Sequence, residues 1–549
     1  MAMPLPGRPF ATDAPLLLWG PSGAGKSTVG RLAAASLRVP FDDLDDLVER
    51  RAGAPVAAIF DRDGEAAFRL RERDELARIL AEPRRRIVAL GGGTLVDPDL
   101  RACALARAVV IGLRTPLETL ATRLRGDTTR PLLGNFTTEA GRARLEALLS
   151  ARSEAYATAH LHIDASRGPE AVASDVARVA GDRYAYVPSR GGGYPVRLTR
   201  DAGAGAADAA FALDATKRIL VTDDRVAPIW ADAVAATMAM WSLPVAGRLV
   251  FAQGEQHKRL ATLETLADEL SLLGADRRAA LVCVGGGVVS DLGGLLAALF
   301  YRGIPWISVP TTLLSMVDAA VGGKTAVDLA RVKNAIGAFH PPRAVVVDTA
   351  HARTETARQM RAGLAEAVKT ALVGDPDLLD LMEREAEGAR DGEPAVLDEI
   401  VARSLAVKIG VVTRDEHETG ERAHLNLGHT LGHALEAAAG FETLLHGEGV
   451  AIGMCAALAV GEARGVTERG LSDRVRSLLD RLGLPTRAPR DLCGRAVGLV
   501  GADKKRLGRE VVVVAVARPG VPTTMRLPLE EAASSLAEAA IGEETPPVF

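Results

Sequence analysis

Residues 16–28, which read LLLWGPSGAGKST, place an apolar run directly before a glycine-rich loop that contains Lys26 and Ser27. A helical pattern follows, so the motif GxxxxGK[ST] lies between a strand and a helix, as a P-loop requires. Its glycines let backbone N–H groups wrap phosphate oxygens at a helix N-terminus, while Lys26 supplies a cation and Ser27 a hydroxyl for Mg²⁺. We therefore predict a nucleoside triphosphate site formed by Gly23, Ala24, Gly25, Lys26, Ser27 and Thr28.

Outward from this loop, short apolar runs alternate with helical patterns. The first strand candidates are residues 16–19, 87–90, 108–113 and 161–164. A second series of strand candidates follows at residues 218–222, 248–251, 280–284, 306–309 and 344–347. Alternation of this kind predicts βαβ units around buried parallel sheets, and so an α/β protein.

The stretch between the two series is rich in Gly, Pro and Arg and has no apolar period, which favours a linker. After about residue 350 the strand signals stop and residues 354–484 read as helices, while the apolar run 511–516 is ambiguous. The predicted units are a P-loop domain with a parallel sheet (1–180), a linker (181–194), a Rossmann-like α/β domain (195–353) and an all-α domain (354–549).

The composition of the 549 residues excludes several classes of protein. Lys+Arg 66 against Asp+Glu 70 gives a net charge of −4, which disfavours a protein that binds nucleic acid by neutralising phosphates. The four cysteines have no CxxC spacing, so neither a disulfide framework nor a cysteine-based zinc site is expected. The N-terminus has no apolar signal region, and the most apolar stretch, 280–300, is interrupted by Asp291 and five glycines. We expect a cytoplasmic protein without a membrane partner.

Polar residues on the C-terminal side of the P-loop suggest a binding site for the molecule that accepts the phosphoryl group of the nucleotide. They are Asp43, Asp45, Arg69, Gly91, Arg130 and Arg152. Each alone is typical of a solvated surface, but together and in this order they resemble shikimate kinase over about residues 14–170. This resemblance implies that Asp45, Arg69, Gly91 and Arg152 hold shikimate. It also implies that the nucleotide is ATP and that Asp43 lies beside Mg²⁺. Arg130 would lie on a lid over the transferring phosphoryl group. The catalytic residues it implies are Lys26, Asp43 and Arg130. Glu154 replaces a proline that is usual in the family.

A second glycine-rich turn, Gly285-Gly-Gly287, follows a strand candidate and opens a helical pattern that contains Asp291. Such a turn lets the backbone approach a pyrophosphate, although a glycine turn required only for packing fits equally well. Further polar loops at 254–258, 311–312 and 322–325 follow other strands. Ligands collect at such carboxyl ends in open α/β sheets.

Five of the ten histidines fall within 30 residues, and His429 and His433 are spaced to share one helix face. HExxH is excluded because Thr430 follows the first histidine. Glu366 stands among apolar residues, where an ionised carboxylate is costly to bury without a cation. These residues indicate a metal site, with ordinary surface or core histidines as the alternative.

The motifs GEQHK, VPTTLL, VDAAVGGKT, AGLAEAVK, LNLGHTLGHALE and LHGE occur in the order typical of 3-dehydroquinate synthase, and the resemblance covers about residues 195–519. It implies Zn²⁺ or Co²⁺ on Glu366, His429 and His446, which places the metal in the all-α domain. It implies catalytic roles for Lys324, Lys369 and His433. The NAD⁺ contacts it implies are Gly254, Glu255, Gln256, His257, Lys258, Gly287, Val288, Val289, Ser290, Asp291, Thr311, Thr312, Lys324, Lys333, His351, Ala352, Arg353 and Thr354. The substrate contacts it implies are Arg302, Asp318, Asn334, Lys408, Arg422, Asn426 and Lys505 (or Lys504). Ser290 stands where the family usually has glycine.

The leading hypothesis is a bifunctional shikimate-pathway enzyme. One half would phosphorylate shikimate with ATP, and the other would convert a phosphorylated heptulosonate to 3-dehydroquinate and phosphate with NAD⁺ and a divalent metal, as a homodimer formed through that half. Two alternatives remain open. The second half could be a metal- and NAD-dependent polyol dehydrogenase, or the first half an inactive nucleotide-binding module that regulates the second.

Overall fold

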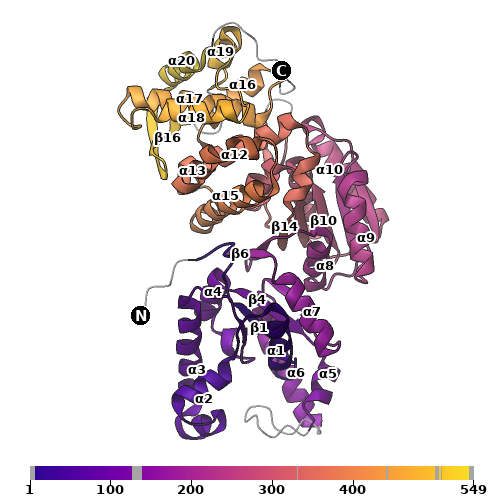
Figure 1. Ribbon diagram of the computed structural model, residues 1–549. Helices are drawn as coiled ribbons and strands as arrows, with labels where there is room; N and C mark the ends of the chain where they lie inside the picture. Colours follow the sequence, from indigo (N-terminus) through magenta and orange to yellow (C-terminus); the bar gives the residue numbers. More distant parts are fainter. Residues whose placement is uncertain are drawn as a thin grey trace.

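The computed structural model describes residues 7–125, 139–329, 332–440, 443–500, 506–507 and 510–542. Figure 1 shows the N-terminal α/β unit below a larger unit, in which a second α/β region continues into a body of helices. Within the described part of the chain, every helix falls short of the length or apolar character needed to cross a bilayer.

The N-terminal unit is built on a five-stranded parallel sheet in the order β2-β3-β1-β4-β5. Its strands are β1 (Leu16–Trp19), β2 (Phe41–Asp43), β3 (Ile87–Ala89), β4 (Val109–Arg114) and β5 (Leu161–Asp164). Its helices are α1 (Lys26–Leu37), α2 (Leu44–Ala52), α3 (Val56–Ala81), α4 (Pro98–Arg107), α5 (Leu117–Arg123), α6 (Glu139–Tyr156) and α7 (Pro169–Val179). Strand β1 is apolar throughout because Leu16 and Leu18 enter one core and Leu17 and Trp19 enter the other. A central strand whose two faces are both covered by helices is expected to have a continuous run of apolar residues.

The second unit has a seven-stranded sheet in the order β6-β7-β14-β11-β10-β8-β9, parallel except for β6. The strands are β6 (Arg183–Val187), β7 (Tyr194–Leu198), β8 (Arg218–Asp223), β9 (Gly247–Phe251), β10 (Ala280–Gly285), β11 (Trp306–Pro310) and β14 (Ala344–Val347). The helices are α8 (Ala202–Ala212), α9 (Asp232–Met240), α10 (Leu260–Leu272) and α11 (Gly287–Leu299). A separate hairpin, β12 (Lys324–Val327) and β13 (Ile336–Phe339), packs near α11. The predicted α/β class with parallel sheets is confirmed in both units.

The segment expected to be a linker, 181–194, is instead part of the second sheet. Strand β6 pairs antiparallel with β7 over five residue pairs, from Arg183 opposite Leu198 to Val187 opposite Tyr194. The Gly- and Pro-rich residues 188–193 are only the turn of this hairpin. The linker prediction is therefore wrong, because a five-residue strand is too short to show a period beside so many turn-forming residues.

A buried ion network joins the two units. Arg197 of β7 donates to Asp182 and to Asp208 of α8, both at 2.6 Å. Asp208 also accepts from Arg178, at the end of the N-terminal unit, at 3.1 and 3.2 Å. Since Arg197 and Asp208 are each 5% exposed, removal of either group would leave an uncompensated buried charge. The junction between the two units therefore depends on this network of buried charges.

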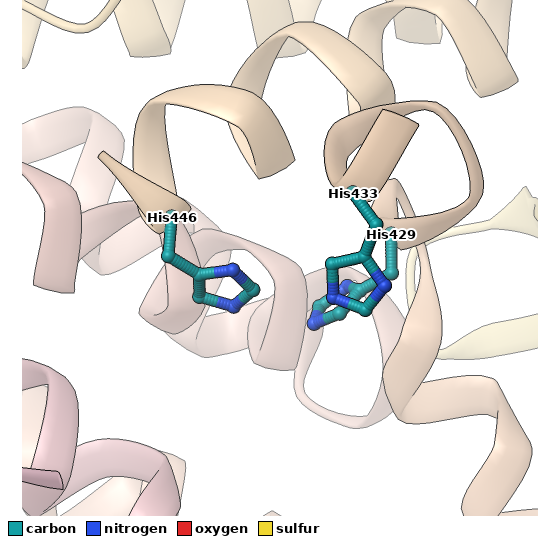
Figure 2. A group of neighbouring side chains, drawn as sticks. All are labelled: His429, His433 and His446. Carbon is teal, nitrogen blue, oxygen red and sulfur yellow. The ribbon is translucent and has the colours of Figure 1, made fainter. Parts of the chain in front are cut away.

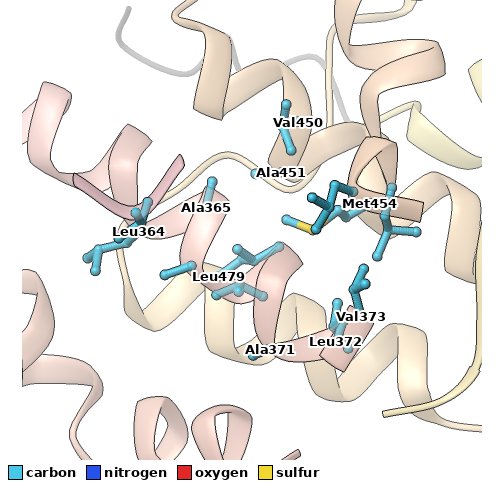
Figure 3. Packing of buried hydrophobic residues seen from close by; sticks show 14 of the residues in the cluster. Leu364, Ala365, Ala371, Leu372, Val373, Val450, Ala451, Met454 and Leu479 are labelled. Carbon is cyan, nitrogen blue, oxygen red and sulfur yellow. The ribbon is translucent and has the colours of Figure 1, made fainter. Parts of the chain in front are cut away.

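The helical domain packs around α12 (Ala357–Gly374) and α17 (His446–Ala463), whose buried side chains interdigitate in Figure 3. The other helices are α13 (Pro376–Arg384), α14 (Ala386–Arg390), α15 (Pro394–Arg414), α16 (His429–Ala438), α18 (Leu471–Arg481), α19 (Arg490–Val497) and α20 (Leu529–Ala540). The ambiguous apolar run 511–516 lies in β16 (Glu510–Arg518), which pairs with β17 (Val521–Pro528) and β15 (Arg506–Leu507). The domain is therefore mainly helical with one small antiparallel sheet.

Helices α16 and α17 approach unusually closely because glycines line their contact. A Cβ on Gly453 would lie 2.0 Å from the carbonyl oxygen of Gly428, and one on Gly432 would lie 2.9 Å from that of Gly449. Side chains at these positions would force the helices apart. The close contact sets the start of α17, with His446, opposite the start of α16, with His429.

Candidate active sites

The phosphate loop of the N-terminal unit leads directly into α1. Gly25 has φ 89° and Gly23 has φ 84°, a region that side chains other than glycine seldom adopt. Lys26 Nζ donates to the carbonyl oxygens of Gly20 at 3.0 Å and Pro21 at 2.9 Å, which holds the ammonium over the loop. Ser27 Oγ donates to Asp43 Oδ2 at 2.6 Å, so the two side chains predicted to lie near Mg²⁺ are in direct contact.

The glycine triplet 91–93 at the end of β3 is the meeting point of the predicted acceptor residues. A Cβ on Gly91 would lie 3.6 Å from Asp45 Oδ1, one on Gly92 would lie 3.6 Å from Arg152 Nη1, and one on Gly93 would lie 2.6 Å from Arg69 Nη2. Asp45, Arg69 and Arg152 thus surround a backbone that has no room for side chains. Arg130 lies outside the described residues.

Two residues of this site were not predicted from the sequence. Glu72, 1% exposed, accepts from Arg69 Nη1 at 2.5 Å and from Thr94 Oγ1 at 2.7 Å, which fixes the guanidinium. Its spacing of three residues from Arg69 on one helix was the available signal. Tyr156, four residues after Arg152 on α6, donates its hydroxyl to the carbonyl oxygen of Gly92 at 2.8 Å.

In the second unit, a cavity of about 1250 Å³ lies at the carboxyl ends of β10 and β11 and extends to the helical domain. The predicted cofactor residues that line it are Gly254, Glu255, Gln256, Lys258, Gly287, Val288, Val289, Asp291, Thr311, Thr312, Lys324, Lys333 and Thr354. The predicted substrate, catalytic and metal residues that line it are Asp318, Asn334, Lys408, Arg422, His433 and His446. The chain runs from β8 outward to β9 and then returns to β10 on the other side, so the cavity opens at the switch point where open α/β sheets bind ligands.

The glycine turn at the start of α11 has the form of a phosphate cradle. A Cβ on Gly285 would lie 2.3 Å from Val289, and one on Gly286 would lie 3.0 Å from Thr312, whereas Gly287 faces more open space. The first two glycines are therefore required by packing, which was the alternative reading of this turn. Gly287 leaves backbone N–H groups of the first helical turn accessible to an anion.

Glu366 and two histidines converge beside this cavity. Glu366 Oε1 lies 3.8 Å from His429 Nε2 and 3.6 Å from His446 Nε2. This oxygen is buried and has no hydrogen-bond partner among the described residues. A tetrahedral ion with bonds of about 2.0–2.1 Å holds its ligand atoms roughly 3.4 Å apart, so a modest contraction would complete such a site.

His433 adjoins the same group. Nitrogen atoms of His429, His433 and His446 lie within 4.8 Å of one another, and Figure 2 shows His446 facing the other two from a separate helix. The imidazole rings of His429 and His446 are each oriented by a contact to the Nδ1 atom. His429 Nδ1 lies 3.1 Å from the carbonyl oxygen of Leu427, and His446 Nδ1 lies 2.8 Å from Glu436 Oε1, so that each ring lies with its Nε2 near Glu366.

Glu436 is a functional candidate that sequence reasoning missed. It is 1% exposed and also accepts from Lys333 Nζ at 3.0 Å. It lies seven residues after His429 and three after His433, which places all three on one helix face. That spacing was a usable signal.

Cations and carboxylates alternate along the cavity. Lys369 bonds to Glu366 and Lys324 bonds to Glu418, while Lys408 Nζ lies 2.5 Å from Asp318 Oδ1. Burial lowers the pKa of Lys408 to about 8 even though Asp318 raises it. Such a lysine gains charge stabilisation when a phosphate dianion approaches.

Other predicted residues are not brought to the cavity surface. Glu366, Lys369 and His429 are buried directly behind it, and Asn426 reaches it through a 2.9 Å hydrogen bond to Glu418. The predicted residues away from the lining are His257, Ser290, Arg302, His351, Ala352 and Arg353. Ser290 is buried in α11, Arg302 is exposed just after the C-terminal end of that helix, and His351 stacks on Trp230, with ring centroids 4.1 Å apart. Lys504 and Lys505 lie outside the described residues.

The fold and the sites define a chain with two enzyme units, a P-loop kinase domain followed by an α/β and helical pair with a carboxylate–histidine cluster. Residues 22–180 match the family model for shikimate kinase. Residues 248–362 match the 3-dehydroquinate synthase N-terminal model, and residues 363–506 match the 3-dehydroquinate synthase C-terminal model.

Relatives of the second half are similar over most of their own length. The 3-dehydroquinate synthase of Xanthomonas campestris pv. campestris is 43% identical over 304 residues, which are 54% of this chain and 82% of that protein. The 3-dehydroquinate synthase of Pelobacter propionicus is 44% identical over 286 residues, 52% of this chain and 79% of that protein.

Solved structures show the same architecture. A 2-deoxy-scyllo-inosose synthase in complex with carbaglucose-6-phosphate, NAD⁺ and Co²⁺ is 25% identical with a TM-score of 0.58, covering 65% of this chain and 99% of that chain. The 2-epi-5-epi-valiolone synthase of Streptomyces hygroscopicus subsp. jinggangensis, with NAD⁺ and Zn²⁺ bound, is 29% identical with a TM-score of 0.57, covering 63% and 97%. The chain belongs to the 3-dehydroquinate synthase family and carries a shikimate kinase domain at its N-terminal end. It is a bifunctional shikimate-pathway enzyme, and the polyol dehydrogenase and inactive-module alternatives are not favoured.

Proposed function

We propose that the kinase half binds ATP with Mg²⁺ at the P-loop, with Ser27 and Asp43 beside the ion. Lys26 neutralises charge on the β- and γ-phosphates, and the three groups around residues 91–93 hold shikimate. Arg69 and Arg152 suit the carboxylate of shikimate because a guanidinium binds a carboxylate through two parallel hydrogen bonds, while Asp45 accepts from its hydroxyls. The 2.6 Å contact between Ser27 and Asp43 supports the shared ion position. Arg130 as a lid residue stays a prediction from the sequence.

We infer that Glu366, His429 and His446 hold a divalent ion, Zn²⁺ or Co²⁺, and that NAD⁺ lies along the cavity from Gly287 toward them. The observation that carries this inference is the unpartnered, fully buried oxygen of Glu366 between two imidazole nitrogens. When bound, the metal polarises substrate oxygens and the nicotinamide accepts and returns a hydride.

The protein groups then act on a phosphorylated sugar acid. Lys324, Lys408 and Arg422 line the cavity and suit its phosphate, while Asp318 and Asn334 suit its hydroxyls. His433, beside the metal group, is placed to move a proton, and Lys369 compensates the charge of Glu366.

Arg302 is exposed on the surface that also carries Leu299 and Tyr301, 56% and 50% exposed, and we propose that the synthase half forms a homodimer there. A cytoplasmic location stays a prediction from the sequence.

The test is to incubate the full chain with the seven-carbon phosphorylated ketoacid, NAD⁺ and Zn²⁺, and to follow phosphate and NADH together. A synthase regenerates NAD⁺ within each turnover, so we expect phosphate to accumulate with no net absorbance of NADH. NADH formed in proportion to turnover would contradict this proposal and favour a dehydrogenase.

Glu436→Gln is expected to weaken metal binding by about 10–100-fold, because an amide orients His446 less firmly and lowers its basicity. Competition of Zn²⁺ with a chromophoric chelator measures the affinity on the full chain. Glu530→Gln, an exposed change on α20, serves as the matched control. Unchanged affinity in Glu436→Gln would show that this carboxylate has no positioning role.

A further inference from the structure

Asp328 is a buried carboxylate at the end of strand β12, and it is not one of the described residues that line the cavity of the synthase half. Its side chain accepts from the backbone N–H of Asn334 at 2.7 Å, and its own N–H donates to the carbonyl oxygen of Lys258 at 2.8 Å. Asp328 is 5% exposed. It therefore joins the loop after β9 to the turn between β12 and β13.

The turn between these two strands has an unusual backbone at Asn334. This residue has φ 53°, in the left-handed region that residues other than glycine adopt infrequently, although asparagine tolerates it better than most. The N–H that Asp328 accepts belongs to this same residue. A hydrogen bond to a carboxylate is stronger than one between neutral groups, so Asp328 stabilises the left-handed conformation of Asn334.

The conformation of the turn directs two neighbouring side chains to different parts of the site. Asn334 Oδ1 accepts from Lys258 Nζ at 2.5 Å, on the side of the proposed cofactor residues. Lys333 Nζ donates to Glu436 Oε2 at 3.0 Å, on the side of the metal group. Because Glu436 also contacts His446, this one turn connects the cofactor residues to a carboxylate that orients a metal ligand.

Lys258 is the cation through which the turn acts on the cofactor part of the cavity. Its side chain is 3% exposed, and its ammonium lies 2.5 Å from Asp291 Oδ2 and 3.6 Å from Glu255 Oε1. Burial opposes the charge of Lys258, but the carboxylates of Asp291 and Glu255 raise its pKa above the usual value. The amide oxygen of Asn334 is a further acceptor for this ammonium, which has three donors to place. The position of the charge thus depends on where the turn holds Asn334.

We propose that Asp328 is a positioning residue of the synthase half. By holding the turn at Asn334, it keeps Lys258 aligned toward NAD⁺ and Lys333 aligned toward Glu436. Asp328 acts through these side chains and does not itself contact a ligand. The inference rests on the NAD⁺ site proposed above.

The test is calorimetric titration of the full chain, loaded with Zn²⁺, with NAD⁺. Asp328→Ala should weaken NAD⁺ binding at least about tenfold, because a charge-assisted hydrogen bond that fixes the turn is lost. Asp328→Asn keeps an acceptor oxygen and should stay within about threefold of the unaltered chain. Asp268→Ala, the same change as the first at an exposed position of α10, serves as the matched control and should have no effect. Each variant is titrated below the midpoint of its thermal unfolding.

A double-mutant cycle separates positioning from a general loss of stability. If Asp328 acts through Asn334, the double variant Asp328→Ala/Asn334→Ala should bind NAD⁺ about as weakly as Asn334→Ala alone. Two effects that multiply would contradict this route. Equal weakening by Asp328→Asn and Asp328→Ala would assign the effect to the charge of Asp328 and overturn the proposed hydrogen-bonding role.

The titration also distinguishes this inference from the proposed cofactor site. If the unaltered chain does not bind NAD⁺, the proposed cofactor site is wrong, and the role of Asp328 is refuted with it. If the unaltered chain and Asp328→Ala bind NAD⁺ equally well, the cofactor site stands and only the role of Asp328 is refuted.

Discussion

Replacement of Glu366 by glutamine is expected to abolish phosphate release from the seven-carbon substrate while ATP-dependent phosphorylation of shikimate continues unchanged. Glu366 is 0% exposed, and its carboxylate lies between the two imidazole nitrogens and Lys369. The amide removes the negative charge that compensates both a divalent ion and a buried ammonium group. The loss of synthase activity should be larger than the reduction of about 10–100-fold that is typical when a residue that only orients a metal ligand is replaced.

Phosphate release and shikimate phosphorylation should be measured on the same preparation, with bound zinc determined by elemental analysis. Glu530→Gln is again the control, because it makes the same chemical change at an exposed position of helix α20. If the variant keeps its zinc and its rate, the metal site lies elsewhere. If a folded variant loses both activities, the two sites are not independent.

Lys26→Met should give the reciprocal result, with loss of kinase activity and normal phosphate release. Lys26 is held over the loop by two carbonyl oxygens, and methionine has similar length without charge. Loss of one preorganised charge at a transferring phosphoryl group should cost at least about a hundredfold in kcat. A coupled assay for ADP, with shikimate varied, measures it.

Arg62→Met is a matched control for Lys26→Met, since it removes an exposed cation of the same domain that pairs only locally with Asp63. The control should keep full activity. Substantial shikimate phosphorylation by Lys26→Met would show that the P-loop lysine is dispensable. Loss of synthase activity in that variant would contradict the separation of the sites.

Much of this architecture is readable from the sequence because its signals are local. Strand β1 was predicted with the bounds that the structure shows, since its continuous apolar run meets a diagnostic loop. The group around Glu366 joins residues 80 positions apart, and only the resemblance to a family, with the cost of burying a lone carboxylate, related them.

What escaped prediction depends on tertiary neighbours. Strands β6 and β7 are short and flank a turn whose composition is that of a linker. Glu72 and Glu436 look like ordinary helix surface residues until the fold buries them against Arg69 and His446. Arg302, chosen by resemblance alone, lies on the exposed surface and does not reach the cavity.

The antiparallel strand at the junction has a consequence for dividing the chain. Since β6 covers the outer hydrogen-bonding edge of β7, a recombinant synthase that starts at residue 195 would expose a bare strand to other copies of itself. A version that starts at residue 181 keeps its own cover, although it loses Arg178 from the ion network. The strand that directly follows the kinase domain thus shields the sheet of the synthase half from self-association, so a boundary before β6 is the better place to divide the chain.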